Sequence, residues 1–329
     1  MLTLRSLAAC ALVTAVACGA CSSPSSGSTG SKRRLSIATG GTGGVFYPYG
    51  GGIAKVITEH LPNTEATAEV TAASVDNLKF LGQGTSDLAF TMADMAQDAV
   101  MARDVFADFG AVQVRTLAVL YSSYSHLVAG ADAGISGITD LRGRVVSTGA
   151  AGSGTTVIAR RMLQAAGLDP ARDIREQSLG VAQSVDALKD GKIDAFFWNG
   201  GLPTAAILDL VNTPGVKASF IATDGQLPRL EKTFGPSLYY RDVIPRGTYD
   251  NDAEIPVVAV ANLLVASADM PDDLAHDITQ VLFDRQGELA AIHPQARTLS
   301  LQTALTGSPV PFHPGAIRFY RERNVWTEQ

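Results

Sequence analysis

The chain has 329 residues, of which 46% are apolar and 18% are charged, so it can bury a sizeable core and is not a disordered chain. Its length suits two average domains. Its 26 basic residues do not outnumber its 32 acidic residues, and the resulting net charge of −6 argues against a nucleic-acid-binding protein, which normally presents a basic face.

The first 34 residues predict export and attachment to a membrane. Residues 7–17 form an uncharged run after Arg5, with the length of the apolar region of a signal peptide and too short to span a bilayer. The run ends in Ala15-Val-Ala-Cys18, which resembles a bacterial lipoprotein signal, where the cysteine is acylated and becomes the new N-terminus. We therefore predict a signal peptide over 1–17 and lipidation at Cys18, with Cys21 as the alternative. An ordinary secretory signal with incidental cysteines is the competing explanation.

A Ser/Gly-rich tether is predicted over residues 18–34, and the folded body is expected to begin at Leu35, outside the cytoplasm. Because all three cysteines lie within the first 21 residues, the body contains neither a disulfide nor a cysteine zinc site. After the signal, the chain contains no run of 18 uninterrupted apolar residues, so no transmembrane helix is expected.

The body alternates short β-branched runs with helical patterns, which is typical of an α/β protein. The same order of strand, glycine loop, helix, helix and strand occurs near 35–92 and again near 144–198, and this repetition predicts two equivalent lobes. In chain order, the pattern predicts strands over 35–39, 87–91, 116–121, 126–131, 144–148, 192–198 and 257–266, and helices over 49–61, 75–81, 157–166, 181–189, about 274–282 and 316–323.

Two glycine loops, Gly40–Gly44 and Gly149–Thr156, each connect a strand to a helix. The start of a helix presents unpaired backbone N–H groups and the positive end of the helix dipole, so both loops predict an anion site. Glycines that merely permit tight turns are the alternative. Neither loop matches a P-loop or a dinucleotide fingerprint, so no cofactor is expected.

Neutral polar and aromatic residues are predicted to surround the same place. For the polar ones a capping role is an equally good explanation, and Ser74 is a good N-cap for its helix. Trp198 ends a strand and is expected to form a pocket wall, whereas Phe196 is expected in the core. The candidate ligand-binding residues are Gly43, Gly44, Tyr47, Ser74, Asn77, Tyr121, Ser153, Gly154, Thr155 and Trp198.

Catalytic motifs are absent from the sequence, which has no G-x-S-x-G, no H-E-x-x-H and no cysteine in the body. The five histidines (His60, His126, His276, His293 and His313) are scattered and each is predicted to be a surface or tail residue. We therefore expect a binding protein without metal or enzymatic activity. A carboxylate pair assembled in three dimensions stays open as an alternative.

Several segments of the body form a recognisable set of motifs. They are Gly40-Gly-Thr-Gly-Gly-Val-Phe-Tyr-Pro48, Ala73-Ser-Val-Asp-Asn-Leu78, Asp87-Leu-Ala-Phe90, Gly152-Ser-Gly-Thr155, Gly191-Lys-Ile-Asp-Ala-Phe-Phe197 and His313-Pro-Gly-Ala-Ile-Arg-Phe-Tyr320. Through these motifs the chain resembles the TAXI family, the extracytoplasmic solute-binding subunits of TRAP transporters. The resemblance runs from Leu35 to about Arg321, although Phe46 stands where family members often have a second tyrosine.

This resemblance implies a type II periplasmic-binding-protein fold, with two α/β lobes that close over a ligand. We expect one lobe over 35–125 plus 262–329 and the other over 126–261. The implied partners are a small anionic or zwitterionic solute, such as glutamate or glutamine, and the permease subunits of an ion-gradient-driven TRAP transporter. A sensory subunit that signals to a membrane kinase or receptor, and a secreted transferase or hydrolase on the same fold, are the alternatives.

Overall fold

The computed structural model describes residues 32–327, and Lys32–Gln329 form one compact unit. The predicted signal peptide, the candidate lipidation sites Cys18 and Cys21, and the tether up to residue 31 lie outside the described residues. None of the described helices combines the length and the apolar character needed to cross a membrane.

The first lobe is built on the repeating order β1(Arg33–Ala38), α1(Phe46–His60), β2(Thr64–Glu69), α2(Ser74–Gly82) and β3(Leu88–Met92). Strand β1 lies parallel to both β2 and β3. Because β1 begins at Arg33, the predicted tether ends before that residue rather than at 34, and the cationic start of the strand is exposed.

The second lobe repeats this order with β5(Val145–Ser147), α4(Gly154–Ala165), β6(Arg175–Gln177), α5(Val181–Lys189) and β7(Ala195–Gly200). Strand β5 lies parallel to β6 and β7, as β1 does to β2 and β3. The predicted repetition is therefore confirmed, with one additional strand between the two helices of each lobe.

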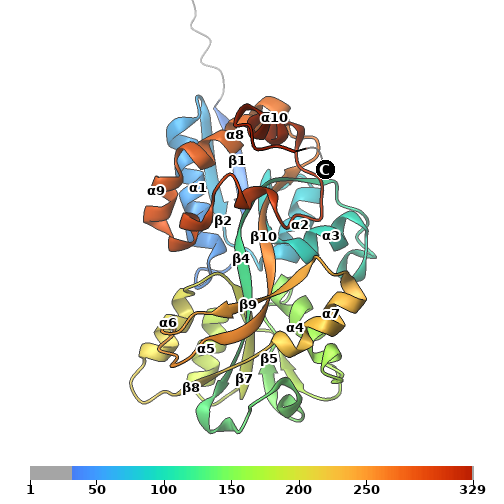
Figure 1. Ribbon diagram of the computed structural model, residues 1–329, viewed down its shortest axis with the longest axis vertical. Helices are drawn as coiled ribbons and strands as arrows, with labels where there is room; N and C mark the ends of the chain where they lie inside the picture. Colours follow the sequence, from blue (N-terminus) through green and yellow to red (C-terminus); the bar gives the residue numbers. More distant parts are fainter. Residues whose placement is uncertain (1–31, 328–329) are drawn as a thin grey trace, which may run out of the picture. The chain divides into compact units, whose positions relative to one another are not determined.

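Two long antiparallel strands, β4(Val114–Gly130) and β10(Ile255–Ser267), run from one lobe to the other (Figure 1). The sheet order β2-β1-β3-β10-β4-β7-β5-β6 is consequently symmetric about their contact. The strands predicted over 116–121 and 126–131 are both parts of β4, so Tyr121 lies inside a strand rather than at its end. The proposed lobe boundaries at 125/126 and 261/262 fall within β4 and β10.

The remaining elements cover this sheet. Strands β8(Ala218–Ile221) and β9(Tyr239–Ile244) pair with β4 and β10, respectively. Helix α8(Asp272–Asp284) packs against α10(Pro314–Glu322) and against α1. It buries the predicted apolar face formed by Leu274, Ile278, Val281 and Leu282. The helices outside the two repeats are α3(Ala93–Val100), α6(Ala205–Asn212), α7(Leu227–Phe234), α8(Asp272–Asp284), α9(Gln286–Ile292) and α10(Pro314–Glu322).

A buried ion cluster joins the two lobes. Arg161 of α4 pairs with Asp94 and Asp98 of α3 and with Asp104, which follows α3. The guanidinium also donates to the Tyr239 hydroxyl, at 2.9 Å, and that hydroxyl donates to Asp94, at 2.8 Å. The side chain of Arg161 is only 3% exposed, so these contacts hold α3 against α4 without competition from water.

Candidate ligand-binding pocket

A cavity of about 420 Å³ lies between the two lobes. Its walls are formed mainly by the segments that follow the carboxyl ends of the parallel strands in both repeats, the usual ligand position in open α/β sheets. From the first lobe and β4 it is lined by Gly40, Gly41, Gly44, Val45, Phe46, Val70, Thr71, Ala72, Ala73, Ser74, Met92 and Tyr121; from the second by Gly149, Ala150, Ser153, Gly154, Thr155, Ser178, Leu179, Gly180, Val181, Gln183, Trp198, Asn199 and Gly200.

Most of the residues predicted to bind a ligand are brought together in this wall. They are Gly44, Ser74, Tyr121, Ser153, Gly154, Thr155 and Trp198. Gly43, Tyr47 and Asn77 are not among the lining residues.

Asn77 is a core residue whose polar atoms are used inside the protein. It is fully buried, and its side-chain amide donates to the carbonyl oxygens of Thr39 at 2.6 Å and Phe90 at 2.8 Å. Its Oδ1 accepts from the Thr71 hydroxyl at 2.5 Å. These bonds tie β1, β3 and the segment before α2 together, so Asn77 supports the pocket from outside its wall.

The two glycine loops allow the lobes to approach each other closely. A Cβ on Gly44 would lie 2.8 Å from Cη2 of Trp198 in the opposite lobe, and one on Gly154 would lie 2.4 Å from Cε of Met92. Gly43 lies against α5 and α6, and its carbonyl accepts from the Ala206 amide at 3.3 Å. The glycines of both loops thus serve lobe contact as well as the shape of the pocket.

Five helices begin at the wall, namely α1, α2, α3, α4 and α5. The Ser153 hydroxyl caps α4 by accepting from the Thr156 amide at 3.2 Å. The backbone N–H groups of Gly154 and Thr155 lie in the first turn of α4, where they have no acceptor within the helix. The arrangement can hold an anion through backbone N–H groups.

Ser74 does not act as the predicted N-cap. Ala73 occupies that position, with φ of 98°, and Ser74 is the first residue of α2. The Ser74 hydroxyl accepts instead from the Met92 amide at 3.2 Å, so it fixes the start of α3 against the start of α2.

Among residues 32–327, the wall of the pocket includes no Lys, Arg, His, Asp or Glu. Two wall residues nevertheless keep buried polar atoms without a hydrogen-bond partner in the described structure, the hydroxyl of Tyr121 and Oδ1 of Asn199. Burial raises the pKa of Tyr121 well above its usual range, so its hydroxyl stays a neutral donor.

Comparison with known proteins places the chain in a family. A sequence model of the NMT1-like family matches residues 37–323. The chain belongs to the NMT1-like family.

Solved structures are similar to this NMT1-like chain over most of its length. A protein from Bordetella bronchiseptica RB50 is 18% identical, with a TM-score of 0.52 over 88% of this chain and 89% of that one. The periplasmic aliphatic sulphonate-binding protein SsuA from Escherichia coli is 18% identical, with a TM-score of 0.48 over 88% and 83% of the two chains. The alkanesulfonate-binding protein SsuA from Xanthomonas axonopodis pv. citri, bound to MOPS, is 16% identical, with a TM-score of 0.48 over 89% and 94%. The predicted two-lobed type II periplasmic-binding fold is confirmed.

Sequence reasoning missed two stretches of the pocket wall in this NMT1-like chain. Residues 70–73 and 178–180 follow β2 and β6, and both strands escaped prediction because they are short and partly exposed. Asn199 was likewise missed, although it directly follows Trp198. Recognising β2 and β6 would have placed the segments after them at the same sheet edge as the glycine loops.

The prediction that every histidine lies on the surface or in the tail is wrong for His126, His276 and His293, whereas His313 does belong to the C-terminal tail, although it is buried there. His126 and His313 are fully buried, and His276 and His293 are 9% exposed. His126 lies within β4, and its Nδ1 bonds to the Tyr124 carbonyl oxygen at 2.8 Å. Burial lowers the pKa of His126 to about 4, so it is a neutral core residue at physiological pH.

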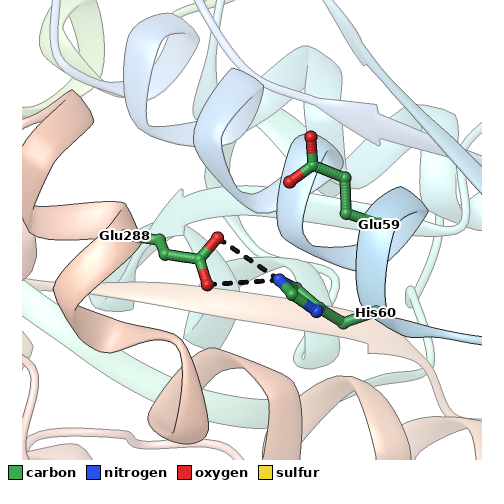
Figure 2. A group of neighbouring side chains, drawn as sticks. All are labelled: Glu59, His60 and Glu288. Carbon is green, nitrogen blue, oxygen red and sulfur yellow. Dashed lines mark hydrogen bonds and ion pairs between the residues drawn. The ribbon is translucent and has the colours of Figure 1, made fainter.

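Among the described residues, Glu59, His60 and Glu288 form a group with a spacing that could hold a metal ion (Figure 2). The three residues lie outside the pocket wall. Glu288 contacts His60, at 3.2 Å, and pairs with Arg285, at 3.5 Å, so its carboxylate already has partners within the protein. The group therefore supports the contact between α1 and α9.

Proposed function

We propose that this protein is an extracytoplasmic solute-binding receptor that captures a small carboxylate or amino acid and delivers it to a membrane permease. The observation that carries the proposal is the cavity between the lobes, ringed by helix N-termini and built with glycines where the lobes meet. Such a site holds an anion by hydrogen bonds and contains no catalytic constellation.

Delivery to an ion-gradient-driven TRAP-type permease is the finer part of the proposal. It is supported by the resemblance of the glycine loop and the following helix to the TAXI family. Lipid attachment through Cys18, or alternatively Cys21, would keep the receptor at the outer surface of the membrane, because two acyl chains are enough for stable anchoring.

The binding part is tested by isothermal titration calorimetry of residues 32–329, the compact unit, against a panel of amino acids, dicarboxylates and monocarboxylates. We expect saturable binding of at least one acid at one site per chain. Binding should also raise the melting temperature as the ligand concentration increases. A flat titration with every member of the panel would refute the proposal.

A further inference from the structure

We infer that the pocket selects a small monoanion that has no ammonium group and an uncharged, largely apolar body. This inference rests on the receptor function proposed above and narrows its range of carboxylates and amino acids.

The absence of charged side chains from the wall is the first reason. An amino acid would bring its ammonium group into the cavity, and a buried cation without an anionic partner is strongly disfavoured. Asp76 of α2 lies against Gly152, outside the wall. The second carboxylate of a dicarboxylic acid would likewise find no basic side chain.

The helix N-termini are the second reason, because their dipoles favour one negative charge and oppose a positive one. Helices α1, α4 and α5 have no acidic residue in the first turn. The first turns of α2 and α3 contain Asp76 and Asp94, respectively. Asp94 is bound in the ion cluster with Arg161 and Tyr239, so it does not supply an anionic partner inside the pocket.

The residues of the wall indicate which kind of ligand body, beyond the anionic group, the pocket accommodates. Val70, Phe46 and Leu179 contribute apolar surface, and Val70 is 57% exposed. Covering that surface with a hydrocarbon chain is favourable, by about 25 cal/mol for each Å² buried. Tyr121 and Asn199 also lie in the wall, and each keeps a buried polar atom without a hydrogen-bond partner in the described structure.

Matched acids separate this inference from the proposed function. Leucine, 2-hydroxyisocaproate and isocaproate share one carbon skeleton and differ in the group on the α-carbon, which is ammonium, hydroxyl or hydrogen. Phenylalanine, phenyllactate and 3-phenylpropanoate form a second series, and glutamate, 2-hydroxyglutarate and glutarate a third. Each is titrated into residues 32–329 by calorimetry.

We expect the hydroxy acid or the unsubstituted acid of the first or second series to bind at least about 100-fold more tightly than the matching amino acid. Tightest binding by an amino acid or a dicarboxylate would overturn the inference and leave the receptor function standing. No binding by any of the acids would overturn both.

Charged substitutions at Gln183 test whether the electrostatic potential in the pocket favours an anion. This wall residue is the third residue of α5, where an acid is compatible with the helix. Gln183→Glu should weaken binding of the monoanion about tenfold and Gln183→Lys should strengthen it by a similar factor. The exposed Gln113, outside the wall, supplies the matched control Gln113→Glu, which should leave affinity unchanged. Equal affinity in the two Gln183 variants would contradict the inference.

Discussion

Replacing Arg161 with methionine tests how the two lobes are held together. Methionine retains most of the volume of the side chain and its packing near Phe234, over which the guanidinium lies at 4.2 Å. It removes the positive charge that faces Asp94, Asp98 and Asp104. The change therefore leaves the buried carboxylates without their cationic partner.

The expected loss follows from this geometry. Removing one partner of a buried ion pair costs about 3–5 kcal/mol, because the remaining charges stay desolvated. A body of about 300 residues unfolds with an entropy of about 0.6 kcal/mol/K, so the melting temperature should fall by about 5–8 °C. Arg160→Met is the matched control, because Arg160 is 48% exposed and its ion pair with Glu176 should contribute less than about 1 kcal/mol.

The loss should also depend on pH. Burial raises the pKa of Asp94 and of Asp98 even when Arg161 is present, and removing the cation should raise both further. A carboxyl with a higher pKa in the folded state takes up a proton on folding, so stability is lost as pH rises through that pKa. The difference in unfolding free energy between the parent protein and Arg161→Met should therefore be largest near pH 8 and shrink towards pH 5, by the same linkage.

Chemical denaturation followed by circular dichroism measures both effects. Unfolding free energies are compared for the parent, Arg161→Met and Arg160→Met at several pH values between about 5 and 8. A loss below about 1 kcal/mol at the highest pH, or an equal loss in the Arg160 variant, would refute the argument that the buried cluster holds α3 against α4.

Three further predictions concern the pocket, its support and the N-terminus. Gly44→Ala should weaken ligand binding about tenfold or more, because the new methyl group meets the opposite lobe, whereas Gly51→Ala, in helix α1 outside the pocket wall and with open space around it, should bind normally in the same calorimetric assay. Asn77→Ala should lower the free energy of unfolding by about 1–3 kcal/mol, since buried carbonyl groups lose their donor, and an unchanged denaturation midpoint would contradict this role. Cys18→Ser should abolish acylation of the expressed full-length chain, whereas Cys21→Ser should retain it; mass spectrometry of the N-terminus decides, and acyl chains on the Cys18→Ser protein would favour the alternative site.

Local patterns in the sequence were sufficient to predict the elements that have a strong periodicity of their own. The helix over 181–189 and the strand over 257–266 have regular apolar positions, and the structure contains both. Strand β2 was missed because its sequence, Thr-Glu-Ala-Thr-Ala-Glu, has only alanine as an apolar residue, and alanine and glutamate are both uncommon in strands. Helix α3 was missed because its buried face includes Asp94 and Asp98. Their partner Arg161 is more than 60 residues away in the chain, so the local sequence does not indicate that these acids are buried.

The glycine loops could be found from sequence because a strand, a run of glycines and a helix define both their geometry and their chemistry. The opposite lobe contributes the other half of each contact. The closeness of Gly44 to Trp198, and of Gly154 to Met92, depends on β4 and β10 bringing two distant repeats together. Loop positions can therefore be predicted locally, whereas the composition of a pocket between them cannot.

In the same arrangement, the stability of the fold and the binding of a ligand depend on different groups of residues. The ion cluster around Arg161 is formed between helices and buries Arg161, Asp94 and Asp98, while the pocket wall leaves the Tyr121 hydroxyl and Oδ1 of Asn199 without partners in the described structure. An unsatisfied buried polar group costs about 1–3 kcal/mol, so these two wall groups lower the stability of the fold as long as they have no partner. Substitutions in the cluster should therefore change the free energy of unfolding far more than the intrinsic affinity for ligand. Substitutions in the wall should change the affinity for ligand far more than the free energy of unfolding. The bound ligand should itself stabilise the fold, increasingly so as its occupancy rises.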